Sequence, residues 1–264
     1  METAPPEPID GLKHVAGQAA EAAGDILRKY FRSGLALETK DAPSPVVTMA
    51  DLEAETAMRE IICAAYPDHA IIGEEFGAKS GTAAITWALD LLDGTIAFVC
   101  GKLMFVSLIG IYDDGPLLGV IDQPILGERW IGGRAMPTEL NGRSCATSGV
   151  SALGQARLST TDPVHLAGSG DQLWFENLRR GVRLTSCGGD GYAYGLLASG
   201  FIDLVVEDGM AWHDAAALVP IVEGAGGAIS DFKGRPLRPG QTRYEVIAAA
   251  SRDLLEAALA LRTE

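Results

Sequence analysis

The segment TWALDLLDGTIAF, residues 86–98, constrains the fold most strongly, because it places two carboxylates inside an otherwise apolar run. An apolar run of this length is typical of a buried β-strand. A turn at the end of the strand explains Asp93 and Gly94, since Asp-Gly is a common turn dipeptide, but it does not explain Asp90. Two carboxylates three residues apart at a strand end repel each other unless a cation or a proton lies between them. The segment therefore predicts a strand that ends at a cation-binding site.

The first half of the chain combines helical and strand-like patterns. Apolar residues recur at helical spacing over 9–31, and a second helix is predicted to begin with Asp51 as its N-cap and to end near 66–67. Strand-like runs follow at 85–90, 105–112, 117–121 and 129–131. A hairpin turn is predicted between the second and the third of these runs. We expect an antiparallel sheet packed against two helices.

Beyond residues 141–142 the pattern changes to alternating strands and helices, which is typical of an α/β arrangement. The predicted strands lie at 156–160 and 182–185, and the predicted helices at 171–180, 192–199 and 215–225. No repeat or long linker separates the halves. We therefore expect an N-terminal α+β subdomain over 1–138 and a C-terminal α/β subdomain over 139–264, with a site at the interface that they share.

Charge and cysteine content narrow the class of protein. The formal net charge is −14, which disfavours nucleic acid and anionic membrane as partners, so a phosphate substrate would require bound cations. The four cysteines include no C-x-x-C pair, which favours reduced thiols in a cytoplasm. The N-terminal sequence lacks a secretory signal pattern, and no apolar run approaches the roughly 20 residues that span a bilayer. We expect a cytoplasmic protein that acts on a small molecule.

Further acidic residues occur next to apolar segments. Glu74 follows a short strand-like stretch, where a solvated loop is the simpler interpretation, and Asp214 precedes an apolar helix, where an N-cap is the simpler one. Carboxylates without paired His or Cys favour Mg²⁺ or Mn²⁺ over zinc. The backbone N–H groups of Gly94 and Thr95, with the Thr95 hydroxyl, are suited to bind a phosphate oxygen.

Taken together and in order, these motifs resemble those of the inositol monophosphatase family of Mg²⁺-dependent phosphatases. The matching segments are VVTMAD at 46–51, GEE at 73–75, WALDLLDGT at 87–95, and Asp214 followed by IVEGAGG at 221–227. The resemblance implies a layered αβαβα sandwich of the inositol monophosphatase and fructose-1,6-bisphosphatase type. It also implies a homodimer.

The resemblance assigns roles to particular residues. It implies that two or three Mg²⁺ ions, for which Mn²⁺ can substitute, are held by Glu74, Asp90, the carbonyl of Leu92, Asp93 and Asp214. Asp51 and Thr95 match the pair that orients and activates the attacking water, and the amides of Gly94 and Thr95 match the phosphate-binding turn. The implied activity is hydrolysis of a small phosphate monoester.

Other segments resemble the histidinol-phosphatase branch of the family, namely 121–130, 188–194 and 218–227. This branch implies hydrolysis of L-histidinol phosphate in histidine biosynthesis. A substrate that carries an ammonium and an imidazole needs acidic partners, for which Asp190 and Glu207 are candidates. A helix cap is an equally good interpretation of Asp190, and a solvated strand end is the alternative for Glu207.

Two other functions stay open. The first is a phosphatase acting on inositol 1-phosphate or another sugar phosphate, although acidic and aromatic residues such as Asp190, Tyr192 and Trp212 favour a cationic substrate. The second is a catalytically weak regulatory relative, although every implied metal ligand is present. Leu91 stands where the family usually has proline. For His213, an exposed neighbour of Asp214 is the preferred interpretation, and a position in the pocket lining is the alternative.

Overall fold

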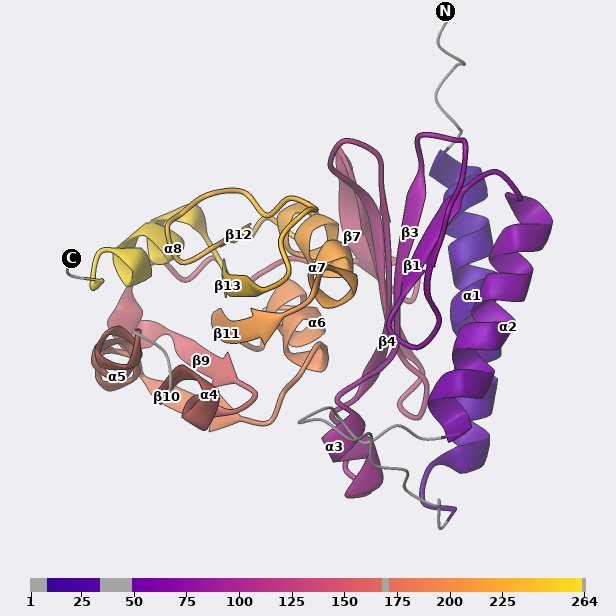
Figure 1. Ribbon diagram of the computed structural model, residues 1–264. Helices are drawn as coiled ribbons and strands as arrows, with labels where there is room; N and C mark the ends of the chain where they lie inside the picture. The colour runs from indigo at the N-terminus through magenta and orange to yellow at the C-terminus, as the bar shows by residue number, and fades with distance from the viewer. Residues whose placement is uncertain (1–8, 34–48, 168–170, 263–264) are drawn as a thin grey trace, which may run out of the picture.

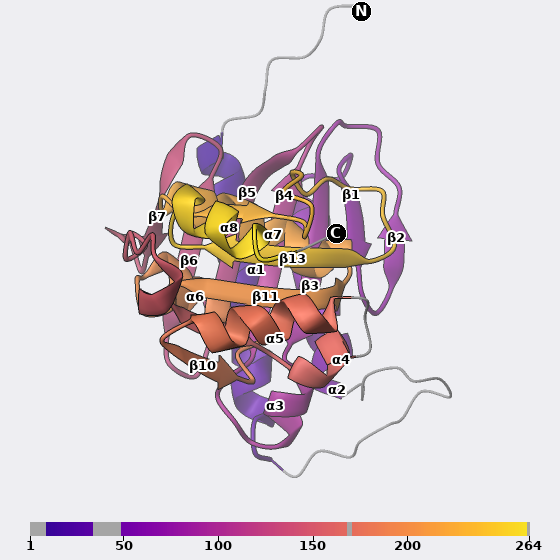
Figure 2. The same ribbon diagram turned by 90° about the vertical axis from the view of Figure 1, so that its left-hand side faces the viewer.

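The computed structural model describes residues 9–33, 49–167 and 171–262, which form two β-sheets separated and flanked by helices. Figure 1 shows the helices α1 and α2 on one face of the first sheet, α6 and α7 between the two sheets, and further helices beyond the second sheet. In Figure 2 these outer helices, α5 and α8, lie in front of strands β11 and β13. The predicted αβαβα sandwich is confirmed.

The two N-terminal helices are α1 (Ile9–Tyr30) and α2 (Met49–Ala65). In α1, Leu12, Ala16, Ala19, Ala23 and Leu27 are fully buried, because their spacing puts them on one face of the helix. The prediction that Asp51 is the N-cap of α2 is wrong. The helix starts two residues earlier, with Ala50 buried in a cluster with Leu92 and Phe98, so that Asp51 lies inside the first turn.

The first sheet has eight strands in the order β2-β1-β3-β4-β5-β6-β7-β8. Their bounds are β1 Ala70–Gly73, β2 Gly77–Lys79, β3 Thr86–Asp93, β4 Val106–Tyr112, β5 Pro116–Gln123, β6 Glu128–Gly133, β7 Met136–Leu140 and β8 Arg143–Ser144. The predicted antiparallel pairing holds except that β1 and β3 are parallel. The exception arises because β2 turns back antiparallel to β1, after which the chain enters β3 in the direction of β1.

The second sheet has five strands in the order β10-β9-β11-β13-β12. The bounds are β9 Arg157–Thr160, β10 Leu184–Cys187, β11 Leu204–Met210, β12 Ala228–Ser230 and β13 Tyr244–Ala249, with helices α4 Pro163–Ala167, α5 Gln172–Gly181, α6 Tyr192–Ala198, α7 Trp212–Gly224 and α8 Arg252–Leu259. Strand β9 pairs in parallel with β10 and β11, as expected for an α/β half. The division at residue 138 stays a prediction, and β8 is the last strand of the first sheet.

Helix α7 connects the two sheets through a shared core. Its residues from Ala215 to Val222 are almost entirely buried, and they pack in one cluster with Leu108 of the first sheet and Val205 of the second. The helix approaches β5 so closely that a Cβ on Gly119 would collide with the carbonyl oxygen of Ala217. The tight packing fixes the position of the N-terminus of α7 relative to β3.

Among the described helices, none is both long and apolar enough to cross a membrane.

Candidate active site

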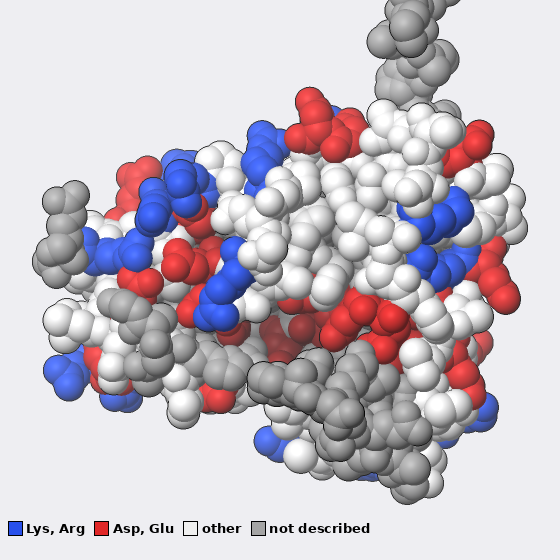
Figure 3. All heavy atoms as spheres, in the orientation of Figure 1, with Lys and Arg blue, Asp and Glu red and all other residues white. Residues whose placement is uncertain are grey.

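A cavity of about 580 Å³ opens between the two halves of the molecule. Figure 3 shows acidic side chains gathered around a hollow in this region. The sequence-predicted residues that line the cavity are Glu74, Asp90, Leu92, Asp93, Gly94, Thr95, Asp190, Glu207 and Asp214. Asp51 does not line it, but it is buried nearby, and its charge contributes to the raised pKa of Asp90. The fold thus brings together acidic residues that are up to 140 positions apart in the sequence, from Glu74 to Asp214.

A β-bulge places Asp90 and Asp93 on the same side of the sheet. Asp90 pairs with Leu108 and Asp93 with Val106, so three steps along β3 oppose two steps along β4. In a regular strand, residues three apart point to opposite faces, and the extra residue of the bulge restores the common face. The hydroxyl of Ser107 donates a hydrogen bond of 2.7 Å to the carbonyl of Leu91 inside the bulge. The bulge is the structural feature that makes the two carboxylates neighbours.

The turn after β3 exposes backbone groups toward the cavity. Gly94 has φ of 84°, and a Cβ there would lie 2.5 Å from the carbonyl oxygen of Met104, so a larger residue does not fit. The short helix α3 (Thr95–Val99) begins directly after it. The hydroxyl of Thr95 donates 2.9 Å to the carbonyl of Leu92, which leaves the lone pairs of the hydroxyl oxygen available to accept a hydrogen bond.

The segment directly after Glu74 is held in place by a buried carboxylate from α2 that the sequence analysis did not identify. Glu55 is fully buried, and its two oxygens accept the backbone N–H groups of Glu75 at 2.9 Å and Phe76 at 3.3 Å. Arg59 donates 2.6 Å to Glu55 and also binds the carbonyl of Gly77. We call this group of interactions the Glu55 clamp. Glu55 follows Asp51 by four residues, and residues at this spacing lie on the same face of a helix. This spacing could have indicated Glu55 from the sequence.

Asp214 lies in the first turn of α7, as its third residue and not as the N-cap. Its Oδ2 accepts the N–H of Ala211 at 2.7 Å, which fixes the carboxylate at the positive end of the helix. His213 was predicted to be an exposed neighbour, and that prediction is wrong. The imidazole lines the cavity, with Nε2 3.2 Å from Oδ1 of Asp214.

The clustering of carboxylates changes their acidity. Burial, followed by the charges of Asp93, Asp214, Glu74 and Asp51, raises the pKa of Asp90 well above its usual range. Burial and neighbouring carboxylates likewise raise the pKa of Asp93 well above its usual range, although the N–H of Gly191 opposes the shift. The pKa of Asp214 is also raised, again mainly by burial. Repulsion of this kind is relieved by a bound cation.

The donor set fits a hard divalent cation. The carboxylates of Glu74, Asp90, Asp93 and Asp214, with the carbonyl of Leu92, supply only oxygen, which Mg²⁺ and Mn²⁺ prefer. Across the described part of the chain, no three acidic, His or Cys side chains already converge as a preformed ion site. The carboxylates of Asp90, Asp93 and Asp214 each accept a backbone N–H group instead.

The part of the cavity wall next to the β3 carboxylates comes from the second half of the chain, and the N–H of Gly191 donates to Asp93 there. The N–H of Asp190 donates 3.0 Å to the hydroxyl of Thr161, and Thr161 in turn donates its N–H and hydroxyl to Glu207 at 2.7 Å and 3.0 Å. Burial raises the pKa of Asp190 to about 6 and that of Glu207 to about 8. We call Asp190, Thr161 and Glu207 the acidic wall. Thr161 is the member that sequence reasoning missed.

The structure corrects two expectations about the residues near the substrate. Asp190 is not a helix cap, because Gly191 is the N-cap of α6 and no side chain caps it. The aromatic residues expected at the rim are elsewhere: Tyr192 is buried and donates its hydroxyl to Glu128, and Trp212 is buried against Tyr244. The wall toward the substrate is therefore acidic without the predicted aromatic rim.

Comparison with known proteins agrees with this geometry. A sequence model of the inositol monophosphatase family matches residues 10–264. The chain is 44% identical to the chloroplastic bifunctional phosphatase IMPL2 of Arabidopsis thaliana over 260 residues, which cover 95% of this chain and 75% of that protein. It is 33% identical over 223 residues to a histidinol-phosphatase of Chlorobaculum parvum, covering 84% of this chain and 86% of that one.

The same relationship is found among solved structures. An inositol monophosphatase from Zymomonas mobilis superposes with a TM-score of 0.87 at 43% sequence identity, covering 97% of this chain and 99% of the other. The similarity therefore extends over nearly the whole chain in both sequence and structure. The resemblance inferred from the motifs is confirmed, and the chain belongs to the inositol monophosphatase family, whose relatives named here are phosphatases.

Proposed function

We propose that this phosphatase is a Mg²⁺-dependent phosphomonoesterase that hydrolyses L-histidinol phosphate to L-histidinol and phosphate. The observation that carries the proposal is the acidic wall, which lines the same cavity as the β3 carboxylates. A phosphate dianion and a cationic alcohol portion would each meet groups of opposite charge there once cations are bound. The histidinol-phosphatases among its relatives support the same substrate.

The residues of the first half act on the phosphate in this proposal. The N–H groups of Gly94 and Thr95 bind a phosphate oxygen, Thr95 and Asp51 orient the attacking water, and the carboxylate of Asp51 accepts its proton. Bound Mg²⁺ would neutralise the phosphate oxygens and lower the pKa of water in the site. Hydrolysis by in-line attack then breaks the bond between phosphorus and the ester oxygen.

The residues of the second half select the alcohol. Thr161 donates two hydrogen bonds to the carboxylate of Glu207 and accepts one from the backbone N–H of Asp190, which positions both residues to bind the ammonium or imidazole of the substrate. Each carboxylate becomes ionised when a cation approaches, despite its raised pKa. A neutral polyol gains no such charge interaction, which favours the amino alcohol ester over inositol 1-phosphate.

The test is a comparison of substrates in wild type and in Glu207→Gln, each with Mg²⁺ and with EDTA. We expect Mg²⁺-dependent phosphate release that prefers histidinol phosphate over inositol 1-phosphate, fructose 1,6-bisphosphate and 3′-phosphoadenosine 5′-phosphate. In Glu207→Gln, kcat/KM for histidinol phosphate should fall at least about tenfold, while that for inositol 1-phosphate stays within about twofold. If the wild type prefers inositol 1-phosphate, that ester replaces histidinol phosphate as the proposed substrate. If Glu207→Gln loses kcat/KM equally for both esters, Glu207 does not have the proposed role.

The alternative substrate, inositol 1-phosphate, is favoured by a different observation. Several relatives carry the name inositol monophosphatase, including one from Mesembryanthemum crystallinum that is 32% identical over 268 residues. The same panel of phosphate esters distinguishes inositol 1-phosphate from histidinol phosphate as the substrate.

We also propose that the protein is a homodimer and that it is located in the cytoplasm. Light scattering of the purified chain tests the proposed homodimer.

A further inference from the structure

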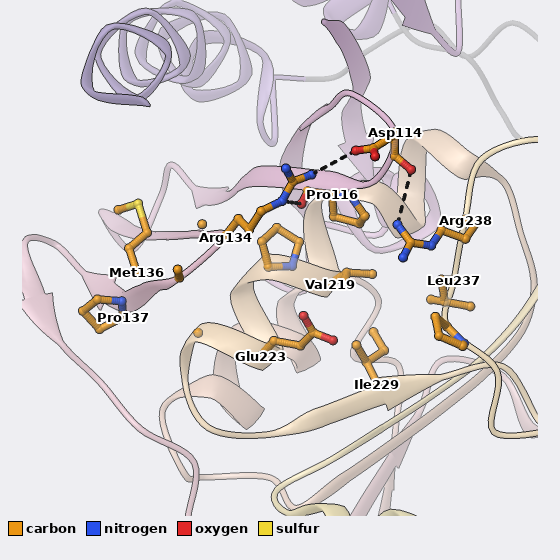
Figure 4. A pocket seen from close by; sticks show the side chains of 15 residues that line it. Asp114, Pro116, Arg134, Met136, Pro137, Val219, Glu223, Ile229, Leu237 and Arg238 are labelled. Carbon is orange, nitrogen blue, oxygen red and sulfur yellow. Dashed lines mark hydrogen bonds and ion pairs between the residues drawn. The ribbon is translucent and has the colours of Figure 1, made fainter. Parts of the chain in front are cut away.

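A second cavity lies at the opposite end of α7 from Asp214. It has a volume of about 680 Å³, within the range of small-molecule sites, and shares no lining residue with the candidate active site. Its walls come from the turn before β5, the turn between β6 and β7, the last turns of α7 and the segment 236–238 (Figure 4).

Part of the wall of this cavity is apolar and conformationally restricted. Four prolines line it, and proline has a fixed φ angle, so these wall segments lose little conformational freedom when a ligand binds. Val219, Ile229 and Leu237 add aliphatic surface. The prolines are Pro116, Pro137, Pro220 and Pro236.

Among the described residues, two opposite charges at this cavity lack an ion-pair partner, and both of these side chains are exposed. Glu223, in the last turn of α7, forms neither a hydrogen bond nor an ion pair with any residue that the structure describes, and Figure 4 shows its carboxylate directed into the cavity. Arg238 donates 3.3 Å to the backbone carbonyl of Asp114, which orients its guanidinium, but it pairs with no carboxylate among the described residues. Burial raises the pKa of Glu223, and the charges of Arg252 and Arg238 oppose that shift.

The other charged groups at the cavity are already neutralised. Arg134 binds Asp113 at 2.6 Å, approaches Asp114 at 3.7 Å and donates to two backbone carbonyls. One unpaired cation beside one unpaired anion does not suit a phosphate dianion, which Glu223 would repel. It suits a ligand that carries one positive and one negative group close together.

We propose that this cavity binds a free α-amino acid with an apolar or aromatic side chain, its ammonium at Glu223 and its carboxylate at Arg238. Charge-assisted hydrogen bonds to both ends are the strong interactions of such a site, because an arginine binds a carboxylate with two N–H groups. The side chain packs on the prolines and Leu237. The site is separate from the phosphatase centre and does not depend on its substrate.

The experiment is isothermal titration of the full chain with each of the twenty free L-amino acids, followed by the N-acetyl and the α-amide derivatives of the tightest ligand. N-acetylation removes the positive group and amidation removes the negative one. We expect submillimolar binding of at least one amino acid, weakened about tenfold or more by either derivative. Because these derivatives probe the wild-type chain, the result does not depend on a variant that folds.

Variants assign the two ends of the ligand. In Glu223→Gln, N-acetylation of the ligand should no longer weaken its binding. In Arg238→Gln, amidation of the ligand should no longer weaken its binding. Glu256→Gln and Lys233→Gln are matched controls, because they remove an exposed charge of the same sign outside the cavity and should retain both effects. The proposal is overturned if no amino acid binds up to about 10 mM. It is also overturned if the derivatives bind equally well, or if both effects persist in both variants.

Discussion

At the scale of single residues, the site depends on carboxylates that would be unfavourable without a bound cation. Asp90, Asp93 and Asp214 are buried together, and each has a raised pKa. A fold keeps such groups only where packing elsewhere outweighs their repulsion, which is why perturbed carboxylates mark functional sites. The hydrogen bonds that orient them come from backbone N–H groups, and these survive substitution by the corresponding amide.

Asp214→Asn should separate the role in catalysis from the role in folding. The amide oxygen of asparagine can still accept the N–H of Ala211, so the first turn of α7 is retained, whereas one negative charge is lost from the cluster. We expect turnover to fall by at least about a hundredfold, while the metal-free protein is as stable as the wild type or more so. Steady-state kinetics at saturating Mg²⁺ and urea unfolding in EDTA measure the two effects. Near-wild-type turnover would contradict the assignment of Asp214.

The Glu55 clamp can be perturbed from both of its sides. Glu55→Gln weakens the hydrogen bonds to the segment that carries Glu74, and Gly73→Ala adds a Cβ that collides with Oε1 of Glu55. Both should weaken binding of Mn²⁺, measured by electron paramagnetic resonance, by about tenfold, because outer hydrogen bonds orient metal ligands.

Thr56→Ala is the control for the Glu55 clamp, since its hydroxyl binds only the backbone of its own helix at the exposed surface. The double variant of Glu55 and Gly73 should be little worse than either single variant, because both disrupt one interaction. Additive losses of Mn²⁺ affinity would show that the two residues act separately.

At the scale of elements, the bulge in β3 and the close packing of α7 determine the site. The bulge brings Asp90 and Asp93 to one face, and α7 delivers Asp214 to the same cavity from the second half of the chain. Neither element can shift without the other, because α7 packs directly on β4 and β5 through Gly110 and Gly119. The geometry of the carboxylates is therefore a property of the packed elements.

Ser107→Ala tests whether the bulge is held by its hydrogen bond. The substitution leaves the buried carbonyl of Leu91 without its partner, which should cost about 1–3 kcal/mol of unfolding free energy. Activity should fall as well, since Asp90 and Asp93 lose their fixed separation. Urea unfolding and phosphate release measure the two consequences. Full activity together with reduced stability would mean that the bulge persists without Ser107.

At the scale of the whole molecule, the acidic cavity makes stability depend on pH and on cations. A carboxyl group whose pKa is higher in the folded state than in the unfolded state stabilises the fold at low pH. This contribution is lost as the pH rises through the folded pKa. Glu207, with a pKa of about 8, and Asp190, with a pKa of about 6, both act in this direction. A cation that binds only the folded protein opposes the loss.

We therefore expect the metal-free protein to lose stability as the pH rises from about 5 to about 8, given an unfolded pKa near 4 for both groups. Glu207→Gln should reduce this decline, and added Mg²⁺ should raise the unfolding free energy most at the alkaline end. Urea unfolding in EDTA at several pH values provides the measurement. The same slope in wild type and Glu207→Gln would contradict the buried, protonated state of Glu207.

The sequence by itself determined the family and the layered architecture, and it named most of the acidic residues that line the cavity, because the acidic motifs are local and each lies next to an apolar element. It also determined α1, whose apolar face is continuous over many turns. It did not determine that Asp90 and Asp93 share a face, since this depends on the bulge opposite Val106 and Leu108.

Only the tertiary structure decided which side chains meet across the cavity. Tyr192 and Trp212 are adjacent to site residues in the sequence but point into the core, because large apolar side chains gain more from burial there. Thr161 and Glu55 support the site through hydrogen bonds with Glu207 and Glu75, which are distant from them in sequence. Such contacts depend on how helices and strands pack, and a single sequence carries no local pattern that specifies them.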